Sequence, residues 1–188
     1  MRIIGGDLGG RKIHPPAKMP NTRPTTDIAK EGLFNILENN LSLTSLKTLD
    51  LFGGTGSISY ELASRGVSDL TVVEKDPVMF AFIQKTAAAL GLQESFRVIR
   101  MDVFRFIEQC TDTFDLIFAG PPYALATIDE LPERVTPLLN PQGWFVLEHT
   151  PRNNYQRNPL YVTERHYGTT IFSILVKRDG TISGTRAD

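Results

Sequence analysis

The chain of 188 residues contains one cysteine, three histidines and no long apolar run. With Cys110 alone, neither an internal disulfide nor a zinc site built from several cysteines can form. His14, His149 and His166 lack the spacing of metal ligands, so we expect no metal site. No apolar stretch approaches the roughly 18 residues that indicate a membrane-spanning helix. These absences favour a protein in water, held together by a hydrophobic core.

A secretory signal is also missing, because residues 1–10 (MRIIGGDLGG) contain Gly and Asp where an apolar segment is required. We therefore expect a cytoplasmic protein without membrane contact. The length and the 41% apolar content suit one globular domain. The expected organisation is a hairpin and linker over 1–25, a domain over 26–178 and a loose tail over 179–188, in a monomer.

Charge is spread unevenly along the chain. Residues 1–25 carry a net +4, residues 151–188 a net +3, and the stretch between them a net −8. Basic ends on an acidic body suggest an anionic macromolecule held through phosphate contacts, although a pattern set by solubility alone is equally consistent. The candidate RNA-binding residues are Arg2, Arg11 and Lys12 in the N-terminal stretch.

Strand-like and helix-like segments alternate through most of the sequence. Repeated β–α–β units with short apolar strands predict a doubly wound α/β fold with a mostly parallel sheet, covered on both faces. At the N-terminus, residues 1–14 alternate around a Gly-rich centre, which predicts an appended β-hairpin. The expected strands are 46–52, 70–74, 96–101, 114–119 and 144–148, with helices over 57–65, 77–90, 103–110 and 127–139 and a closing hairpin of 160–165 and 169–177.

A glycine-rich loop follows the first of these strands, in the sequence Asp50-Leu-Phe-Gly-Gly-Thr-Gly56. Its glycines let the backbone turn tightly and approach a ligand closely. A dinucleotide site would need a third glycine in G-x-G-x-x-G, and that glycine is missing after Gly56. Asp50 would sit poorly beside a pyrophosphate, whereas it suits the cationic amino-acid part of S-adenosylmethionine.

Two further carboxylates end the next two strands. Glu74 follows the second strand and can accept hydrogen bonds from both hydroxyls of a ribose, while Asp102 follows the third strand and can accept from an adenine amine. Either acid alone is more simply explained as a helix cap. Three acidic strand ends in succession favour a cofactor site.

These features resemble class I methyltransferases, and the flanking motifs resemble the RsmD family over nearly the whole chain. The motifs are RIIGG at 2–6, RPTTD at 23–27, KEGLFNIL at 30–37 and ERHYGTT at 164–170. The resemblance implies methylation of the N2 amine of a guanine in 16S ribosomal RNA, free or in the assembling small subunit. It also implies a pocket for S-adenosylmethionine lined by Arg23, Thr25, Asp50, Phe52, Gly53, Gly54, Gly56, Glu74, Asp102 and Val103.

The reaction motif of this family departs from its pattern at one residue. The family has Asp or Asn before Pro-Pro-Tyr or Pro-Pro-Phe, whereas this chain has Gly120 before Pro121, Pro122 and Tyr123. Rigid prolines would fix backbone carbonyls toward the pocket, and the tyrosine ring could stack on a flipped-out base. These four residues are the candidate catalytic residues.

Because Gly120 departs from the motif, the sequence is consistent with more than one function. If position 120 normally supplies a hydrogen-bond acceptor, we expect this chain to bind the cofactor but transfer methyl slowly, and Gly120→Asp to restore about 10²–10⁴ in rate. The alternatives are a catalytically silent RNA-binding homologue, an amino-methyltransferase acting on DNA and, less favoured, a nicotinamide-dependent dehydrogenase.

Overall fold

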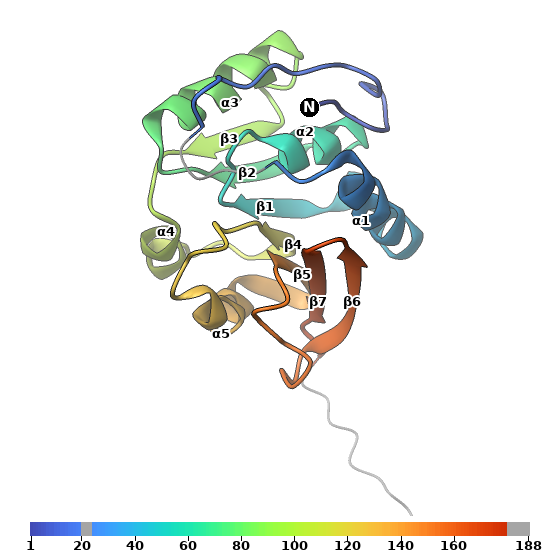
Figure 1. The fold of residues 1–188 in the computed structure, drawn as a ribbon, viewed down its shortest axis with the longest axis vertical. Coiled ribbons are helices and arrows are strands. Elements are labelled where there is room, and N and C mark those ends of the chain that lie inside the picture. Colours follow the sequence, from blue (N-terminus) through green and yellow to red (C-terminus); the bar gives the residue numbers. More distant parts are fainter. Residues whose placement is uncertain (20–23, 180–188) are drawn as a thin grey trace, which may run out of the picture.

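The structure is a computed structural model that describes residues 1–19 and 24–179, and its centre is a seven-stranded sheet (Figure 1). The strand order is β3-β2-β1-β4-β5-β7-β6. Only the pairings of β7 with β5 and with β6 are antiparallel. The strands are β1 (Lys47–Leu51), β2 (Asp69–Val73), β3 (Phe96–Ile99), β4 (Phe114–Ala119), β5 (Leu139–His149), β6 (Tyr161–Tyr167) and β7 (Thr170–Val176).

Helices cover both faces of this sheet. Apolar side chains of α1, α2 and α3 pack on one face, and those of α4 and α5 pack on the other. Short 3₁₀ turns precede β1 and flank α5. The helical elements are α1 (Asp27–Asn40), η1 (Leu43–Ser45), α2 (Ser57–Ser64), α3 (Pro77–Ala89), α4 (Val103–Gln109), η2 (Ile128–Glu130), α5 (Leu131–Val135) and η3 (Thr136–Leu138).

The register of the parallel strands determines what lies at one edge of the sheet. Leu51 of β1 is aligned with Val73 of β2 and with Ala119 of β4, and Ala119 is aligned with Leu147 of β5. Each of these residues lies at or near the carboxyl end of its strand. The residues that follow the four strands therefore meet along the same edge, where open α/β sheets bind their ligands.

The mostly parallel α/β sheet and its antiparallel closing pair match the prediction from sequence. The helical stretch expected near 127–139 is present, and it is divided into η2, α5 and η3. Pro137 has no backbone N–H to donate to the preceding turn, so a regular helix cannot continue through it.

The expectation of an N-terminal β-hairpin was wrong. Residues 1–14 fold back on themselves, but among the described residues they form one isolated bridge, Arg2 with Lys12, and no strands. The stretch is packed onto the domain instead of projecting from it, since Ile3 and Ile13 are buried against Tyr60 of α2. The backbone N–H groups of Ile4, Gly5, Asp7 and Leu8 donate to α2, whereas those of Ile3, Gly10 and Ile13 donate across the fold-back.

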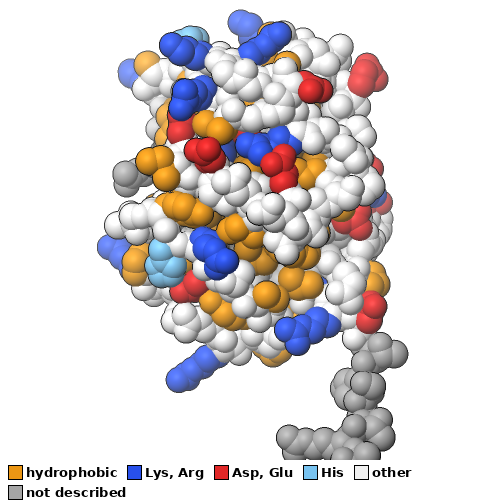
Figure 2. Space-filling view, turned by 90° about the vertical axis from the view of Figure 1, so that its right-hand side faces the viewer, with side chains coloured by type: hydrophobic (Ala, Val, Ile, Leu, Met, Phe, Trp, Pro, Cys, Tyr) orange, Lys and Arg blue, Asp and Glu red, His pale blue; other side chains and the backbone are white. Residues whose placement is uncertain are grey.

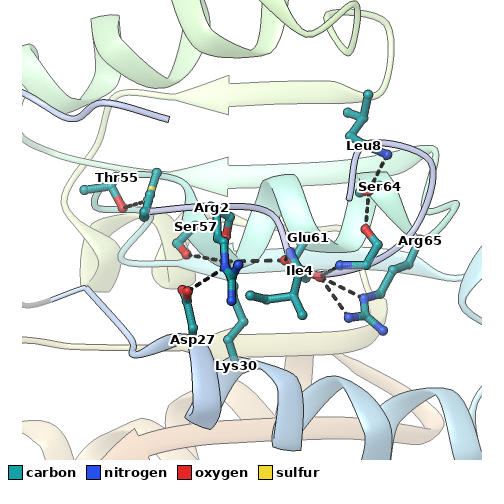
Figure 3. Close-up of polar contacts among 12 residues, drawn as sticks. Arg2, Ile4, Leu8, Asp27, Lys30, Thr55, Ser57, Glu61, Ser64 and Arg65 are labelled. Atoms are coloured by element: carbon teal, nitrogen blue, oxygen red, sulfur yellow. Dashed lines mark hydrogen bonds and ion pairs between the residues drawn. The ribbon is translucent and has the colours of Figure 1, made fainter. Parts of the chain in front are cut away.

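A buried carboxylate fastens this N-terminal segment to the domain (Figure 3). The two oxygens of Glu61 accept hydrogen bonds from the backbone N–H groups of Ile4 and Gly5, both at 2.9 Å. Arg65 Nη2 lies 2.9 Å and Lys30 Nζ 3.4 Å from the same carboxylate. Burial lowers the pKa of Lys30, and the adjacent Glu61 carboxylate opposes that shift. The carboxylate of Glu61 is thus contacted by two cationic side chains and by two backbone N–H groups.

No helix of the described residues is long and apolar enough to cross a membrane. Residues 20–23 of the expected linker lie outside the described residues. So do residues 180–188 of the expected tail.

We predict that Glu61→Gln lowers the free energy of unfolding by about 3–5 kcal/mol, because it leaves Lys30 buried beside a neutral group. Urea unfolding followed by circular dichroism measures the change. The matched control is Glu38→Gln, since Glu38 pairs with Arg65 with its side chain 45% exposed. An exposed pair of this kind is worth about 0–1 kcal/mol. Equal effects of the two substitutions would contradict the anchoring role of Glu61.

Candidate active site

A cavity of about 670 Å³ opens at the carboxyl ends of β1, β4 and β5. Its wall combines the glycine-rich loop after β1, the Gly120–Tyr123 turn after β4, the end of β5 and the chain before α1. The main lining residues are Thr25, Asp50, Phe52, Gly53, Gly54, Thr55, Ser57, Gly120, Pro121, Pro122, Tyr123, Leu125 and Glu148.

The glycine-rich loop turns through left-handed backbone conformations. Gly54 has φ 57° and Gly56 has φ 82°, and even Phe52 is held at φ 63°. Such a conformation is uncommon outside glycine and marks a position that the surrounding structure holds in place. Gly53 leaves no room for a side chain, since a Cβ there would lie 2.6 Å from Val72 Cγ1. At Gly53 and Gly54 the loop therefore presents only backbone to the cavity.

Asp50 lies at the back of this cavity and is 1% exposed. Its Oδ2 accepts a hydrogen bond of 2.5 Å from Ser59 Oγ. Burial raises the pKa of Asp50 to about 7, and the nearby carboxylates of Glu74 and Glu148 act in the same direction. A cation bound here would restore the ionised form, because an opposite charge favours the carboxylate.

The other two acidic strand ends already have local partners. Glu74 Oε2 accepts from Gly54 N at 2.7 Å, and Glu74 Oε1 accepts from Asp76 N at 2.8 Å, so its carboxylate braces the glycine-rich loop. Asp102 is exposed, and its Oδ1 caps the N-terminus of α4. A carboxylate has about four acceptor sites, so these bonds leave sites for a ligand.

Several candidate residues stand behind or beside the cavity wall. Within the described part of the chain, the wall does not include Gly56, Glu74, Asp102 or Val103. Gly56 is buried against Tyr60, and Val103 begins α4. Arg23 lies outside the described residues.

The Gly120–Tyr123 turn follows β4, the neighbour of β1, and forms another part of the cavity wall. Pro121 is buried, Pro122 is exposed and Tyr123 is half-buried. The hydroxyl of Tyr123 donates a hydrogen bond of 2.9 Å to Glu148 Oε1 and lies 3.3 Å from Thr170 Oγ1. These contacts hold the tyrosine ring at the mouth of the cavity.

Glu148 is a cavity residue that reasoning from sequence missed. It lies near the end of β5, is 5% exposed, and its Oε2 accepts a hydrogen bond of 2.8 Å from Thr25 Oγ1. Burial raises its pKa, while the hydrogen bonds from Thr25 and Tyr123 oppose the shift. The signal was present, since Glu148 ends an apolar strand in the same manner as Asp50 and Glu74.

The electrostatic character of the cavity is unusual. It contains the carboxylates of Asp50 and Glu148, and no lysine or arginine among residues 1–19 and 24–179 contributes to its wall. A phosphate-bearing ligand would meet no cation from these described residues. A ligand with positive charge, such as one with a sulfonium and an ammonium, suits these donors and acceptors. The residues present therefore fit S-adenosylmethionine better than a dinucleotide.

Comparison with known proteins agrees with this geometry. A family model described as "Conserved hypothetical protein 95" matches residues 1–176. The chain is 32% identical over 148 residues to the ribosomal RNA small subunit methyltransferase D of Escherichia coli K12, a match that spans 79% of this chain and 71% of that protein. This chain belongs to the RsmD family.

Solved structures of other proteins have the same fold as this RsmD-family chain. The putative methyltransferase yhhF of Escherichia coli matches with a TM-score of 0.80 at 26% identity, over 95% of this chain and 98% of that one. An RNA methyltransferase of Salinibacter ruber, solved with S-adenosyl-L-homocysteine, matches with a TM-score of 0.68 over 88% of this chain and 100% of that one. At 14% identity, the second likeness shows the fold alone. The sheet is that of a class I methyltransferase.

The candidate RNA-binding residues of this RsmD-family chain lie away from the cavity wall, on the N-terminal segment. Arg11 and Lys12 are exposed, while Arg2 Nε donates a hydrogen bond of 2.9 Å to Asp27 of α1. Lys and Arg side chains gather at the same end of the molecule in Figure 2. Arg2 is therefore partly neutralised by its neighbour, whereas Arg11 and Lys12 present their charge to solvent.

Proposed function

We propose that this protein transfers a methyl group from S-adenosylmethionine to the exocyclic N2 amine of a guanine in 16S ribosomal RNA. The observation that carries the proposal is a cavity at the switch edge of the sheet that holds two buried carboxylates and is walled by the Pro-Pro-Tyr turn. The identity to a methyltransferase of the small ribosomal subunit supports the substrate class.

The glycine-rich loop and the acidic strand ends would hold the cofactor. Asp50 would bind the ammonium group, Glu74 the ribose hydroxyls and Asp102 the adenine amine, with Val103 beside the ring. When bound, the cofactor supplies a methyl group activated by attachment to a positively charged sulfur. Gly53 and Gly54 line the cavity without a side chain, which allows close approach of the ligand.

The turn after β4 would hold the base. A guanine amine is a weak nucleophile because its lone pair is delocalised into the ring, so the enzyme must orient it and accept its N–H groups. The ring of Tyr123 offers a stacking surface for a base turned out of the RNA, and the Pro121 carbonyl offers an acceptor. Gly120 contributes no side chain to this task.

Mapping of methylated guanines in ribosomal RNA by mass spectrometry tests the function. RNA from cells with this gene is compared with RNA from the same cells after its deletion and after complementation. We expect one N2-methylguanine of 16S RNA to disappear on deletion and to return with the gene. An unchanged 16S map would contradict the proposal. If the protein binds intact small subunits but does not methylate them, it is a silent RNA-binding homologue. If deletion removes a methylated base from DNA instead, the protein is a DNA methyltransferase.

The raised pKa of Asp50 predicts that cofactor affinity depends on pH. At pH 6 the carboxyl is mostly protonated, because its pKa is about 7, and binding of an ammonium must first remove that proton. Affinity for S-adenosylhomocysteine should therefore rise by up to about tenfold per pH unit below pH 7 and level off above it. Titration calorimetry across this range measures it. Asp50→Asn should bind weakly with a flat profile, and a flat profile in the natural sequence would contradict the assignment.

The basic N-terminal segment predicts a salt-dependent contribution to RNA binding. Changing Arg2, Arg11 and Lys12 together to Gln should make the slope of log affinity against log salt shallower by about 2 to 3. The affinity for S-adenosylhomocysteine should stay the same. Arg97→Gln serves as a control, because Arg97 is an exposed cation of β3, outside the N-terminal segment, and pairs with Asp112. The N-terminal segment would be excluded as the phosphate contact by either of two results. One is a salt slope that the triple substitution leaves unchanged, and the other is a slope that Arg97→Gln changes as much per charge as the triple substitution does.

A further inference from the structure

The carboxylate of Glu148 occupies the space next to the residue that lacks a side chain. Ala119 of β4 and Leu147 of β5 are paired in register, so Gly120 and Glu148 follow them side by side. A Cβ added at Gly120 would lie 3.5 Å from Glu148 Oε2, in van der Waals contact. An acidic group therefore reaches this part of the cavity from β5 and not from β4.

The carboxylate is held in place but retains capacity for another donor. Tyr123 donates to Oε1 at 2.9 Å and Thr25 to Oε2 at 2.8 Å, one bond to each oxygen. An ionised carboxylate has about four acceptor sites, so roughly two remain. Since Glu148 belongs to the wall of the cavity, a donor on a bound ligand can reach it.

A purely structural role explains Glu148 poorly. Tying Thr25 and Tyr123 to the sheet requires two acceptors, which a neutral amide oxygen and a water would provide without a buried charge. Within the described residues, no lysine, arginine or histidine forms an ion pair with Glu148, so the cost of burying its charge is not offset by a cation. A buried acid of this kind in a cavity indicates function more than stability.

We propose that Glu148 accepts an N–H of the target amine and takes up its proton, the task that the family motif assigns to position 120. This inference rests on the proposed function. The amine nitrogen forms the bond to the methyl carbon as the carbon–sulfur bond breaks and leaves its electron pair on sulfur. The nitrogen then gives one proton to a Glu148 oxygen, which leaves a neutral N-methyl amine, and the carboxyl later loses that proton to water.

This assignment reverses the expectation for Gly120. A carboxylate introduced at position 120 would lie against Glu148, where two like charges cannot both ionise easily. The backbone at Gly120 does not require glycine by a positive φ, and a Cβ would meet the Phe118 ring at 3.1 Å, so the ring must shift slightly. Gly120→Asp should consequently fold and bind cofactor but raise turnover less than about threefold.

The test is a pair of substitutions and their combination, assayed in single turnover on small ribosomal subunits from the deletion strain. Glu148→Ala should lower the rate by about 10²–10⁴, and Glu148→Gln by less but clearly, since an amide accepts a hydrogen bond but no proton. In the Glu148→Ala background, Gly120→Asp should recover part of the lost rate. In the natural sequence, Gly120→Asp should change the rate little. Glu133→Gln, an exposed acid of α5, is the control.

A binding measurement gives a readout that does not depend on turnover. Once the guanine is mapped, RNA is prepared with guanosine or inosine at that position, because inosine lacks only the N2 amine. With S-adenosylhomocysteine present, the natural sequence should prefer guanosine by roughly tenfold to a hundredfold, the usual effect of one hydrogen bond to a charged group. Glu148→Ala should lose this preference while keeping its affinity for S-adenosylhomocysteine.

The possible failures can be told apart. If the natural sequence does not methylate the subunits, the proposed function fails and this inference fails with it. If the natural sequence is active but Glu148→Ala matches it in rate and in preference for guanosine, the assignment of Glu148 alone is overturned. A gain of 10²-fold or more from Gly120→Asp in the natural background would likewise overturn it. Loss of cofactor affinity in Glu148→Ala would reassign the residue to the cofactor.

Discussion

The parallel register of β2, β1, β4 and β5 is the constraint on which the rest of the site depends. Backbone hydrogen bonds align Leu51, Val73, Ala119 and Leu147, so the residues that follow these strands emerge along one edge. A shift by one residue would turn each side chain to the other face of the sheet. The glycine-rich loop, the bracing Glu74 and the pair of Gly120 and Glu148 all follow from that alignment.

Within this frame, two acidic side chains lie in the cavity, and no lysine or arginine of the described residues lines it. Asp50 and Glu148 are buried in the cavity, and burial raises the pKa of both. The contrast with Glu61 is informative, because its equally buried carboxylate is matched by Lys30, Arg65 and two backbone donors. Glu61 serves the fold by fastening the N-terminal segment, whereas the two cavity acids are suited to groups that arrive with a ligand.

Much of this fold could be predicted from the sequence, since strand and helix periods alternate regularly. Residues typical of helix ends also stand where the helices begin and end: Asp76 caps the start of α3, and Gly66 and Gly91 follow the C-caps of α2 and α3. The N-terminal stretch could not, because alternating residues around glycines suit a hairpin as well as a loop packed on Tyr60. Glu148 was overlooked because its partners Thr25 and Tyr123 are 123 and 25 residues away in the chain. For the same reason, the sequence did not reveal that Glu148 lies next to position 120.

A crystal structure with S-adenosylhomocysteine tests the account most directly. The account predicts that the ligand's amino group lies against Asp50, and that Glu148 keeps its hydrogen bonds to Thr25 and Tyr123 with its remaining acceptor sites open toward the space beside Gly120. A ligand whose amino group or ribose hydroxyls bind Glu148 would contradict the account, as would a ligand found outside this cavity.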